Sequence, residues 1–263
     1  LPDHVYLSDA LGRKLAKFLD DGGKIIASHS SGRALEGGVC PLPGWPSQWL
    51  GESRYSINYL RPIANGLGPD VEGYDYVLYE PAASLKALPG ATISATVVEP
   101  YFDRTAAHFC SHRQTPPDRD TGSPAVLQTD RIIHFAPPIF RAYRNHGNIV
   151  YKVLVRNAID RLLPDPLLSH DLPSTAEVTV RRQGGRHIVH VLHYAPQRRA
   201  EIDIVEDALP LTGFRIGIRS IRPPTRAYLI PKEEELPMHY ENKYASVTIP
   251  VMKGHAHIVF DAS

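Results

Sequence analysis

The spacing of hydrophobic residues near the beginning of the chain predicts one helix followed by one strand. Apolar residues recur at helical spacing between Leu11 and Leu19, after a capping Ser8 and before Gly22-Gly23, which would end the helix. The mostly apolar run Lys24–Ser28 then predicts a short buried strand. Such a unit belongs to a parallel sheet, which needs further strands and helices on both faces. We therefore expect Leu1 to enter a domain part-way, as the C-terminal part of a larger protein.

The following residues predict further elements of the same α/β domain. Short strands are predicted at Tyr76–Tyr79, Ala91–Val98, Pro124–Leu127 and Arg131–Phe135, the last two as a hairpin. The segment 30–70 is rich in Gly and Pro, contains both tryptophans, and is predicted to be a long irregular loop. Apolar residues at helical spacing predict a closing helix from Ile149 to Leu163, before Pro164.

Beyond this helix the pattern changes from the helical period to the alternation of a strand. Residues 165–174 are punctuated by proline and are predicted to be a linker. Short strands separated by turn residues are typical of a β-sandwich when they recur about every 8–12 residues. We thus expect an α/β domain at residues 1–163 and an antiparallel β-sandwich at residues 174–263. The predicted strands of the sandwich are Glu177–Arg181, His187–Tyr194, Glu201–Val205, Phe214–Arg219, Arg226–Ile230, Tyr244–Ile249 and His255–Phe260.

Charge and composition narrow the range of partners. The chain of 263 residues has 29 Lys and Arg against 28 Asp and Glu, so its charge does not favour nucleic acid or an anionic membrane as a partner. No apolar run approaches the ~18 residues of a membrane helix. Two cysteines, Cys40 and Cys110, do not make a disulfide framework, although they leave one disulfide possible. We expect a reducing, bacterial cytoplasmic compartment.

Cys110 is the first candidate for chemistry, in the sequence His108-Phe109-Cys110-Ser111-His112. A catalytic cysteine of an amidohydrolase needs a strand–turn–helix elbow with small neighbours, and this context offers none. Three ligands from one extended run rarely surround a metal ion, and no fourth ligand is evident, so we predict no metal. A polar loop that meets a sugar or another domain, or a purely structural loop, fits better. His187, His190 and His193 are spaced by three, so neighbours lie on opposite faces of a strand and do not converge on one ion. His255 and His257 share a face and are interpreted as a solvated strand surface.

Glu99 and Asp103 are close enough in sequence to suggest the acid–base pair of a glycosidase. Asp103 precedes a ready salt-bridge partner, Arg104, so a structural role is favoured for both carboxylates. Tyr101 and the tryptophan-containing segment could stack on a sugar ring, or could equally be buried against a neighbouring domain.

Five stretches carry a resemblance to a known family. The opening LPDHVYLSDALGRKLAKFLDDGGKIIAS resembles the flavodoxin-like, class I glutamine-amidotransferase-like domain called the β-galactosidase trimerisation domain. The stretches VVEPYFDRTAAHFCSHRQTPP, HFAPPIFRAYRNHGNIVYK, RHIVHVLHYAP and IPVMKGHAHIVFD resemble α-L-fucosidase-like glycoside hydrolases of that group. The resemblance covers nearly the whole chain.

The resemblance implies that the catalytic carboxylates lie on an N-terminal barrel that this sequence lacks. It also implies an amidotransferase-like domain without its nucleophile, which serves homo-oligomerisation and shapes an active site. We accordingly expect no catalytic residue, cofactor or metal here, and only indirect contact with carbohydrate. The residues expected to face substrate or barrel are His29, Trp45, Tyr101, His108, His112 and Arg113. A free-standing carbohydrate-binding protein is the alternative, and a cysteine-dependent amidohydrolase is a third.

Overall fold

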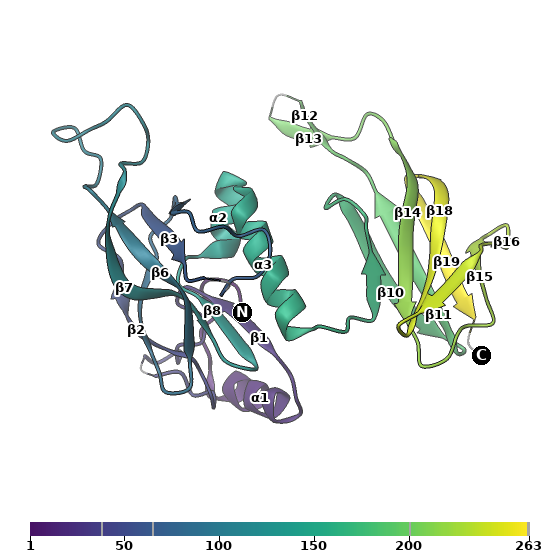
Figure 1. Ribbon diagram of the computed structural model, residues 1–263, viewed down its shortest axis with the longest axis horizontal. Coiled ribbons are helices and arrows are strands. Elements are labelled where there is room, and N and C mark those ends of the chain that lie inside the picture. Colours follow the sequence, from purple (N-terminus) through teal and green to yellow (C-terminus); the bar gives the residue numbers. More distant parts are fainter. Residues whose placement is uncertain (38, 65, 200, 262–263) are drawn as a thin grey trace. The chain divides into compact units, whose positions relative to one another are not determined.

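The computed structural model describes residues 1–37, 39–64, 66–199 and 201–261, which form two compact units, Leu1–Pro164 and Asp165–Ser263 (Figure 1). Strands predominate, and the described residues contain three α-helices. None of the three is both long and apolar enough to cross a membrane. Each unit has its own hydrophobic core.

Unit 1 is built on a six-stranded sheet with the strand order β1-β8-β7-β6-β3-β4. β1 and β8 are parallel, with Ile25 opposite Ile132, and the other four pairings of this sheet are antiparallel. Beside it, β2 and β5 form a two-stranded sheet. In chain order the elements are α1 (Asp9–Asp20), β1 (Ile25–Ser28), β2 (Ser47–Glu52), β3 (Asn58–Pro62), β4 (Tyr76–Leu78), β5 (Ala83–Ala87), β6 (Thr92–Pro100), β7 (Pro117–Gln128), β8 (Ile132–Phe135), α2 (Ile139–His146) and α3 (Ile149–Leu162).

Helices cover both faces of the parallel pair. Successive residues of a strand point to opposite faces, so Ile132 and Ile133 of β8 enter different cores. Ile132 packs in the cluster that contains Leu19 of α1, whereas Ile133 packs in the cluster that contains Tyr151 of α3. The parallel pair therefore packs against α1 on one face and against α3 on the other.

The local predictions for unit 1 agree with the structure in most places. Ser8 caps α1 by accepting a hydrogen bond from the Leu11 amide, and α3 ends one residue before its predicted end. The predicted hairpin is the β7–β8 pair, with Leu127 opposite His134.

The predicted parallel sheet and the predicted long loop need correction. The flavodoxin-like arrangement is not confirmed, because parallel pairing is limited to β1 and β8 and antiparallel strands complete the sheet. The segment 30–70 is not irregular throughout, since it contains β2 and β3. Both strands are short, and each pairs with a strand distant in sequence, β2 with β5 and β3 with β6. The local Gly and Pro content therefore predicted a loop instead.

Unit 2 is an antiparallel β-sandwich. One sheet has the order β10-β11-β19-β15-β16 and the other the order β17-β18-β14-β9, with β12 and β13 as a separate hairpin. Alternate residues of β14, Phe214, Ile216 and Ile218, are buried in the core between the sheets. The strands are β9 (Leu168–His170), β10 (Ala176–Gln183), β11 (Arg186–His193), β12 (Gln197–Arg199), β13 (Ile202–Ile204), β14 (Pro210–Arg219), β15 (Arg226–Ile230), β16 (Glu234–Glu235), β17 (Met238–Glu241), β18 (Tyr244–Lys253) and β19 (His255–Asp261).

The segment expected to be a linker contributes a strand to the sandwich. β9 lies within residues 165–174 and pairs with β14, with Leu168 opposite Ile218. Tyr244 donates a hydrogen bond of 2.6 Å from its hydroxyl to the Pro166 carbonyl. Three residues are too short for a pattern to be read from sequence, so only this pairing reveals the edge strand.

The sandwich core should depend strongly on Ile216, which is fully buried. Ile216→Ala removes packed methyl groups and leaves a cavity, so we expect a loss of about 2–5 kcal/mol in the free energy of unfolding. Urea denaturation followed by circular dichroism measures this loss. Val251→Ala on β18, where the side chain is 58% exposed, is the control and should cost under about 0.5 kcal/mol. Equal effects of the two substitutions would contradict the assigned core.

Candidate functional site

The candidate site is the loop of residues 101–116 that joins β6 to β7, here called the β6–β7 loop. It projects from the ends of these two strands at the upper left of Figure 1. The Tyr101 amide donates to the Pro116 carbonyl at 3.1 Å, and the Thr115 hydroxyl donates to the Phe102 carbonyl at 2.8 Å. Tyr59 of β3 donates its hydroxyl to the Thr115 carbonyl. The base of the loop is therefore fixed to the sheet.

Hydrogen bonds within the loop also involve Cys110. Its thiol lies 3.3 Å from the His112 carbonyl and 3.5 Å from the Gln114 carbonyl, both within hydrogen-bond reach for sulfur. The His108 amide donates to the Thr105 hydroxyl at 3.0 Å, and the His108 ring packs 5.7 Å from that of Phe102. The Cys110 thiol thus contacts two carbonyls of its own loop. Cys110 does not lie in a turn between a strand and a helix.

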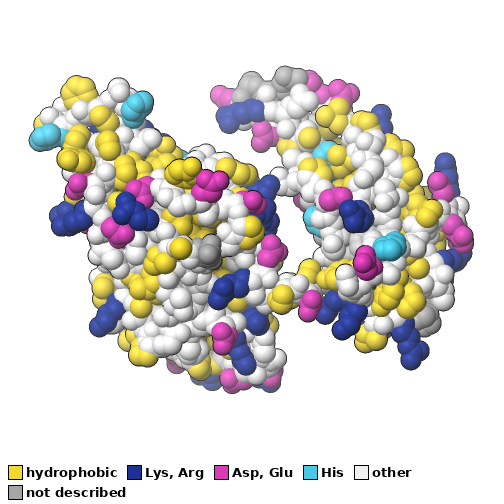
Figure 2. All heavy atoms as spheres, viewed as in Figure 1, with side chains coloured by type: hydrophobic (Ala, Val, Ile, Leu, Met, Phe, Trp, Pro, Cys, Tyr) yellow, Lys and Arg dark blue, Asp and Glu magenta, His cyan; other side chains and the backbone are white. Residues whose placement is uncertain are grey.

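The outer surface of the loop combines aromatic and imidazole side chains. Tyr101 is 66% exposed and Phe109 is 71% exposed, and both His108 and His112 are exposed as well. Figure 2 shows histidine and hydrophobic side chains gathered at the tip of this projection. Large exposed aromatics beside donors and acceptors are typical of surfaces that meet a partner or a sugar.

A cavity of about 260 Å³ lies beneath the loop and is lined by both polar and aromatic groups. The Arg113 guanidinium lies 5.2 Å from the centre of the Tyr79 ring, and the Tyr79 hydroxyl donates to the Gln114 side chain at 3.2 Å. Asp103 accepts hydrogen bonds from the amide and the hydroxyl of Ser56. The full lining is Ser56, Ile57, Tyr79, Pro100, Phe102, Asp103, Arg104, Arg113 and Thr115.

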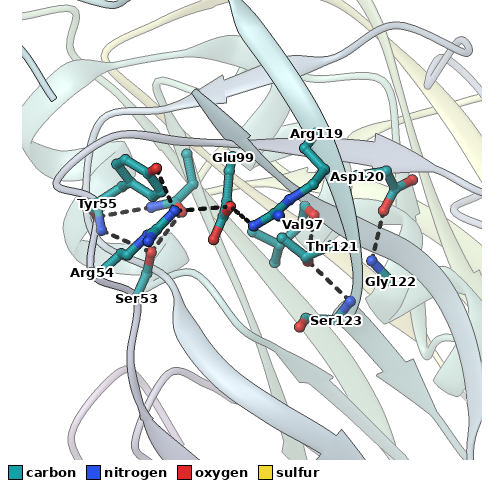
Figure 3. Close-up of polar contacts among 11 residues, drawn as sticks. Ser53, Arg54, Tyr55, Val97, Glu99, Arg119, Asp120, Thr121, Gly122 and Ser123 are labelled. Carbon is teal, nitrogen blue, oxygen red and sulfur yellow. Dashed lines mark hydrogen bonds and ion pairs between the residues drawn. The ribbon is translucent and has the colours of Figure 1, made fainter. Parts of the chain in front are cut away.

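Glu99 is held by two arginines at the end of β6 (Figure 3). Its carboxylate accepts from Arg119 at 2.6 Å and pairs with Arg54 at 3.5 Å. The hydrogen bond and the charge of Glu99 raise the pKa of the Arg119 guanidinium. The predicted partner of Asp103, Arg104, is replaced by Ser56, but the structural role expected for both carboxylates agrees with these contacts.

No group of three or more His, Cys, Asp or Glu in the described part of the chain could hold a metal ion, which includes the His108–Cys110–His112 run. Both cysteines are free.

Unit 2 contains a cluster of three histidines that sequence spacing did not predict, because the cluster forms across two strands. His190 of β11 lies opposite His257 of β19 with ring centres 4.6 Å apart, and His255 lies 5.5 Å from His257.

The predicted site residues separate into two groups within unit 1. Tyr101, His108, His112 and Arg113 belong to the β6–β7 loop, whereas His29 and Trp45 line a different cavity of about 240 Å³ at the end of β1. His134 also lines that second cavity and is not among the residues that the sequence predicts for a site. The parallel pairing of β1 and β8 places His134 beside this cavity, and no pattern of neighbouring residues in the sequence predicts that pairing.

Comparisons with known proteins identify structures of the same fold. No family model and no curated protein matches the chain. The α-L-fucosidase isoenzyme 2 from Paenibacillus thiaminolyticus matches with a TM-score of 0.90 and 28% sequence identity, over 100% of this chain and 40% of that chain. The resemblance to α-L-fucosidase-like glycoside hydrolases is thereby confirmed.

Two β-galactosidases, from Rahnella sp. R3 and Bacillus circulans sp. alkalophilus, share the fold. Each matches with a TM-score of 0.55 over 97% of this chain and 31% of the β-galactosidase chain, at 15% and 13% identity respectively. The chain therefore spans well under half of each of these hydrolases.

The attachment of the β6–β7 loop to the sheet can be tested at Tyr59. Tyr59→Phe removes the hydroxyl that donates to the Thr115 carbonyl, and an unpaired buried acceptor costs about 1–3 kcal/mol. The loop should then detach more often, and trypsin should cleave faster after Arg104 or Arg113. Limited proteolysis with mass analysis of the fragments measures the rate. Tyr74→Phe, at a 65% exposed side chain, is the control, and equal rates in both variants would contradict the anchoring role.

Proposed function

We propose that the chain is the non-catalytic C-terminal region of an α-L-fucosidase-like glycoside hydrolase. The observation that carries this proposal is the match of the whole chain to only 40% of the Paenibacillus fucosidase, at a TM-score of 0.90. The remaining 60% of such an enzyme has room for a catalytic barrel. The two β-galactosidases match this chain over only 31% of their own length, which supports the same separation of a catalytic region from this C-terminal region.

The contacts of the carboxylates near the β6–β7 loop support a catalytic centre outside this chain. Hydrolysis of a glycosidic bond requires a pair of carboxyl groups, one of them protonated so that it can act as an acid. The Glu99 carboxylate is paired with Arg54 and Arg119. The Asp103 carboxylate accepts hydrogen bonds from the amide and the hydroxyl of Ser56. Both carboxylates are therefore engaged by partners within unit 1, as structural groups are.

The geometry at the end of β1 supports an amidotransferase-like origin for unit 1 without amidotransferase chemistry. A nucleophile elbow places its reactive residue in a strained turn directly after a strand. His29 follows β1 directly and has a φ of 51°, so it occupies such a turn, but it is not a cysteine or a serine. Cys110 lies far along the chain in the β6–β7 loop. We assign unit 1 to homo-oligomer assembly and to shaping an active site.

The β6–β7 loop is the part of unit 1 that we assign to the active site of its own or a neighbouring barrel. Tyr101 and Phe109 offer aromatic faces to a sugar or to the barrel, and His108, His112 and Arg113 offer hydrogen-bond donors. The anchored base holds these groups in place, so a partner would meet a preorganised surface.

The chain by itself should not hydrolyse glycosides, because the acid and the nucleophile are assigned to the barrel. Release of the aryl group from aryl α-L-fucosides and aryl β-galactosides, followed across pH, measures this. Turnover of ~1 per second or more would be an ordinary enzymatic rate. Such turnover, abolished by Glu99→Gln or Asp103→Asn, would overturn the proposal.

In the complete enzyme, substitutions of His112 and of Cys110 should have different effects on activity. His112→Ala should weaken turnover or binding by about 1–3 kcal/mol, as expected when a polar partner is left unpaired. Cys110→Ser keeps a group that can donate to the same two carbonyls, so activity should change little. Steady-state kinetics of both variants with an aryl fucoside provide the measurement. The opposite result, an unchanged activity in His112→Ala and a loss of activity in Cys110→Ser, would contradict this proposal and favour a cysteine-dependent amidohydrolase.

A further inference from the structure

The second cavity of unit 1 contains a buried imidazole, that of His29. His29 is 1% exposed, and neither ring nitrogen has a hydrogen-bond partner among the residues that the structure describes. The Glu52 carboxylate lies 3.9 Å from Nε2, which is too far for a hydrogen bond. Burial, with the nearby His4, lowers the pKa of His29 to about 4, so the ring is neutral near neutral pH. It therefore has one unused donor and one unused acceptor.

The strained backbone of His29 is held by several fixed contacts. Its amide donates to the Phe135 carbonyl at 2.8 Å, and its carbonyl accepts from His134 Nε2 at 2.9 Å. Because His134 donates through Nε2 and is neutral, with a pKa lowered to about 4 by burial, its Nδ1 accepts from the Ser47 hydroxyl at 2.6 Å. A left-handed non-glycine residue costs about 1–3 kcal/mol, and such strain concentrates at functional sites. The unpartnered ring is thus held in a defined place.

Two indole rings form walls of the cavity. Trp49 packs edge-on against His29 at 5.3 Å, and Trp45 lies 5.2 Å from His134. A Cβ at position 32 would overlap the Trp45 ring, so Gly32 permits the close packing that fixes this indole. The Arg33 guanidinium lies 4.9 Å from the centre of the Trp49 ring. The full lining is His29, Ser31, Arg33, Val39, Cys40, Trp45, Ser47, Gln48, Trp49 and His134.

The chemistry of these walls selects one class of ligand. The neutral imidazole of His29 needs a partner that both donates and accepts, as a hydroxyl group does. Indole rings pack well against the C–H face of a sugar ring, and Gln48 adds further hydrogen-bonding capacity. No carboxylate is present among the described residues that line the cavity, and the one guanidinium is stacked on Trp49. The volume of about 240 Å³ is below the range for drug-sized ligands, which begins at about 300 Å³.

From these observations we propose that the cavity at the end of β1 binds one neutral monosaccharide ring, with His29 as its central hydrogen-bonding residue. Cys40 takes no part in the chemistry of this site, because burial raises the pKa of its thiol to about 11. The site is separate from the β6–β7 loop, and it does not rest on the hydrolase assignment. A hydroxyl of the sugar would satisfy the two unused ring positions of His29, which explains why the fold tolerates them unpartnered.

Tryptophan fluorescence reports this cavity directly. The chain has two tryptophans, and both line the cavity, so selective excitation of tryptophan monitors this site alone. We expect a saturable change in emission when L-fucose, D-galactose or their methyl glycosides are titrated into the 263-residue chain. His29→Asn should lower the affinity on the order of tenfold, because Asn tolerates the left-handed backbone but does not reproduce the imidazole.

A control variant makes the titration specific. His239→Asn, at an exposed histidine of unit 2, should leave the affinity unchanged. Thermal unfolding by circular dichroism should show that His29→Asn remains folded.

The same titrations can overturn the proposal in three ways. The first is the absence of a saturable change with any of the neutral sugars. The second is an unaltered affinity in a folded His29→Asn variant. The third is binding of D-galacturonate alone, lost in Arg33→Gln, which would make the cavity an anion site. None of these results depends on glycosidase activity, so a failure here is distinguishable from a failure of the proposed function.

Discussion

The position of β8 between β1 and β7 is the constraint on which the rest of unit 1 depends. β8 runs parallel to β1 and antiparallel to β7, so it joins the one parallel pair of the described sheet to the antiparallel strands. All four residues of β8 are buried, with Ile132 in one core and Ile133 and Phe135 in the other. Because one face packs α1 and the other packs α2 and α3, a slip of one residue would exchange the two cores. The hydrophobic effect therefore specifies this register strongly.

The same register creates the polar arrangement at the end of β1. Ala27 lies opposite His134, which directs the His134 ring to the carbonyl of His29 and to Ser47. Asp3 adds a second support, since it accepts from the Ser28 hydroxyl at 2.6 Å and from the Arg141 amide of α2 at 2.7 Å. A turn surrounded by so many fixed partners can retain a strained residue and an unpartnered ring. The monosaccharide site that we propose is a consequence of this rigidity.

The antiparallel half of the sheet serves the other candidate site. β6 and β7 pair with several register shifts, which bend the pair and carry the β6–β7 loop beyond the sheet. Tyr59 and the arginine pairs around Glu99 stabilise the base, while the aromatic tip stays exposed. Unit 1 thus combines a buried, neutral cavity with an exposed, mixed polar and aromatic loop. These are different chemistries, and they suit a small ligand and a large partner surface respectively.

Sequence alone determined the elements whose signals are local. The helical spacing after Ser8, the hairpin of β7 and β8, the helix ending near Leu162 and most strands of the sandwich were predicted, because capping, turn residues and periodicity are properties of neighbours in the chain. The family resemblance was also visible in sequence. Tertiary structure alone decided that β2, β3 and β9 are strands, that the sheet is mostly antiparallel, and that Asp103 is bound to Ser56. It also brought His29, Trp49 and His134 to one cavity, since their proximity depends on strand pairing between residues about a hundred positions apart, which no local pattern encodes.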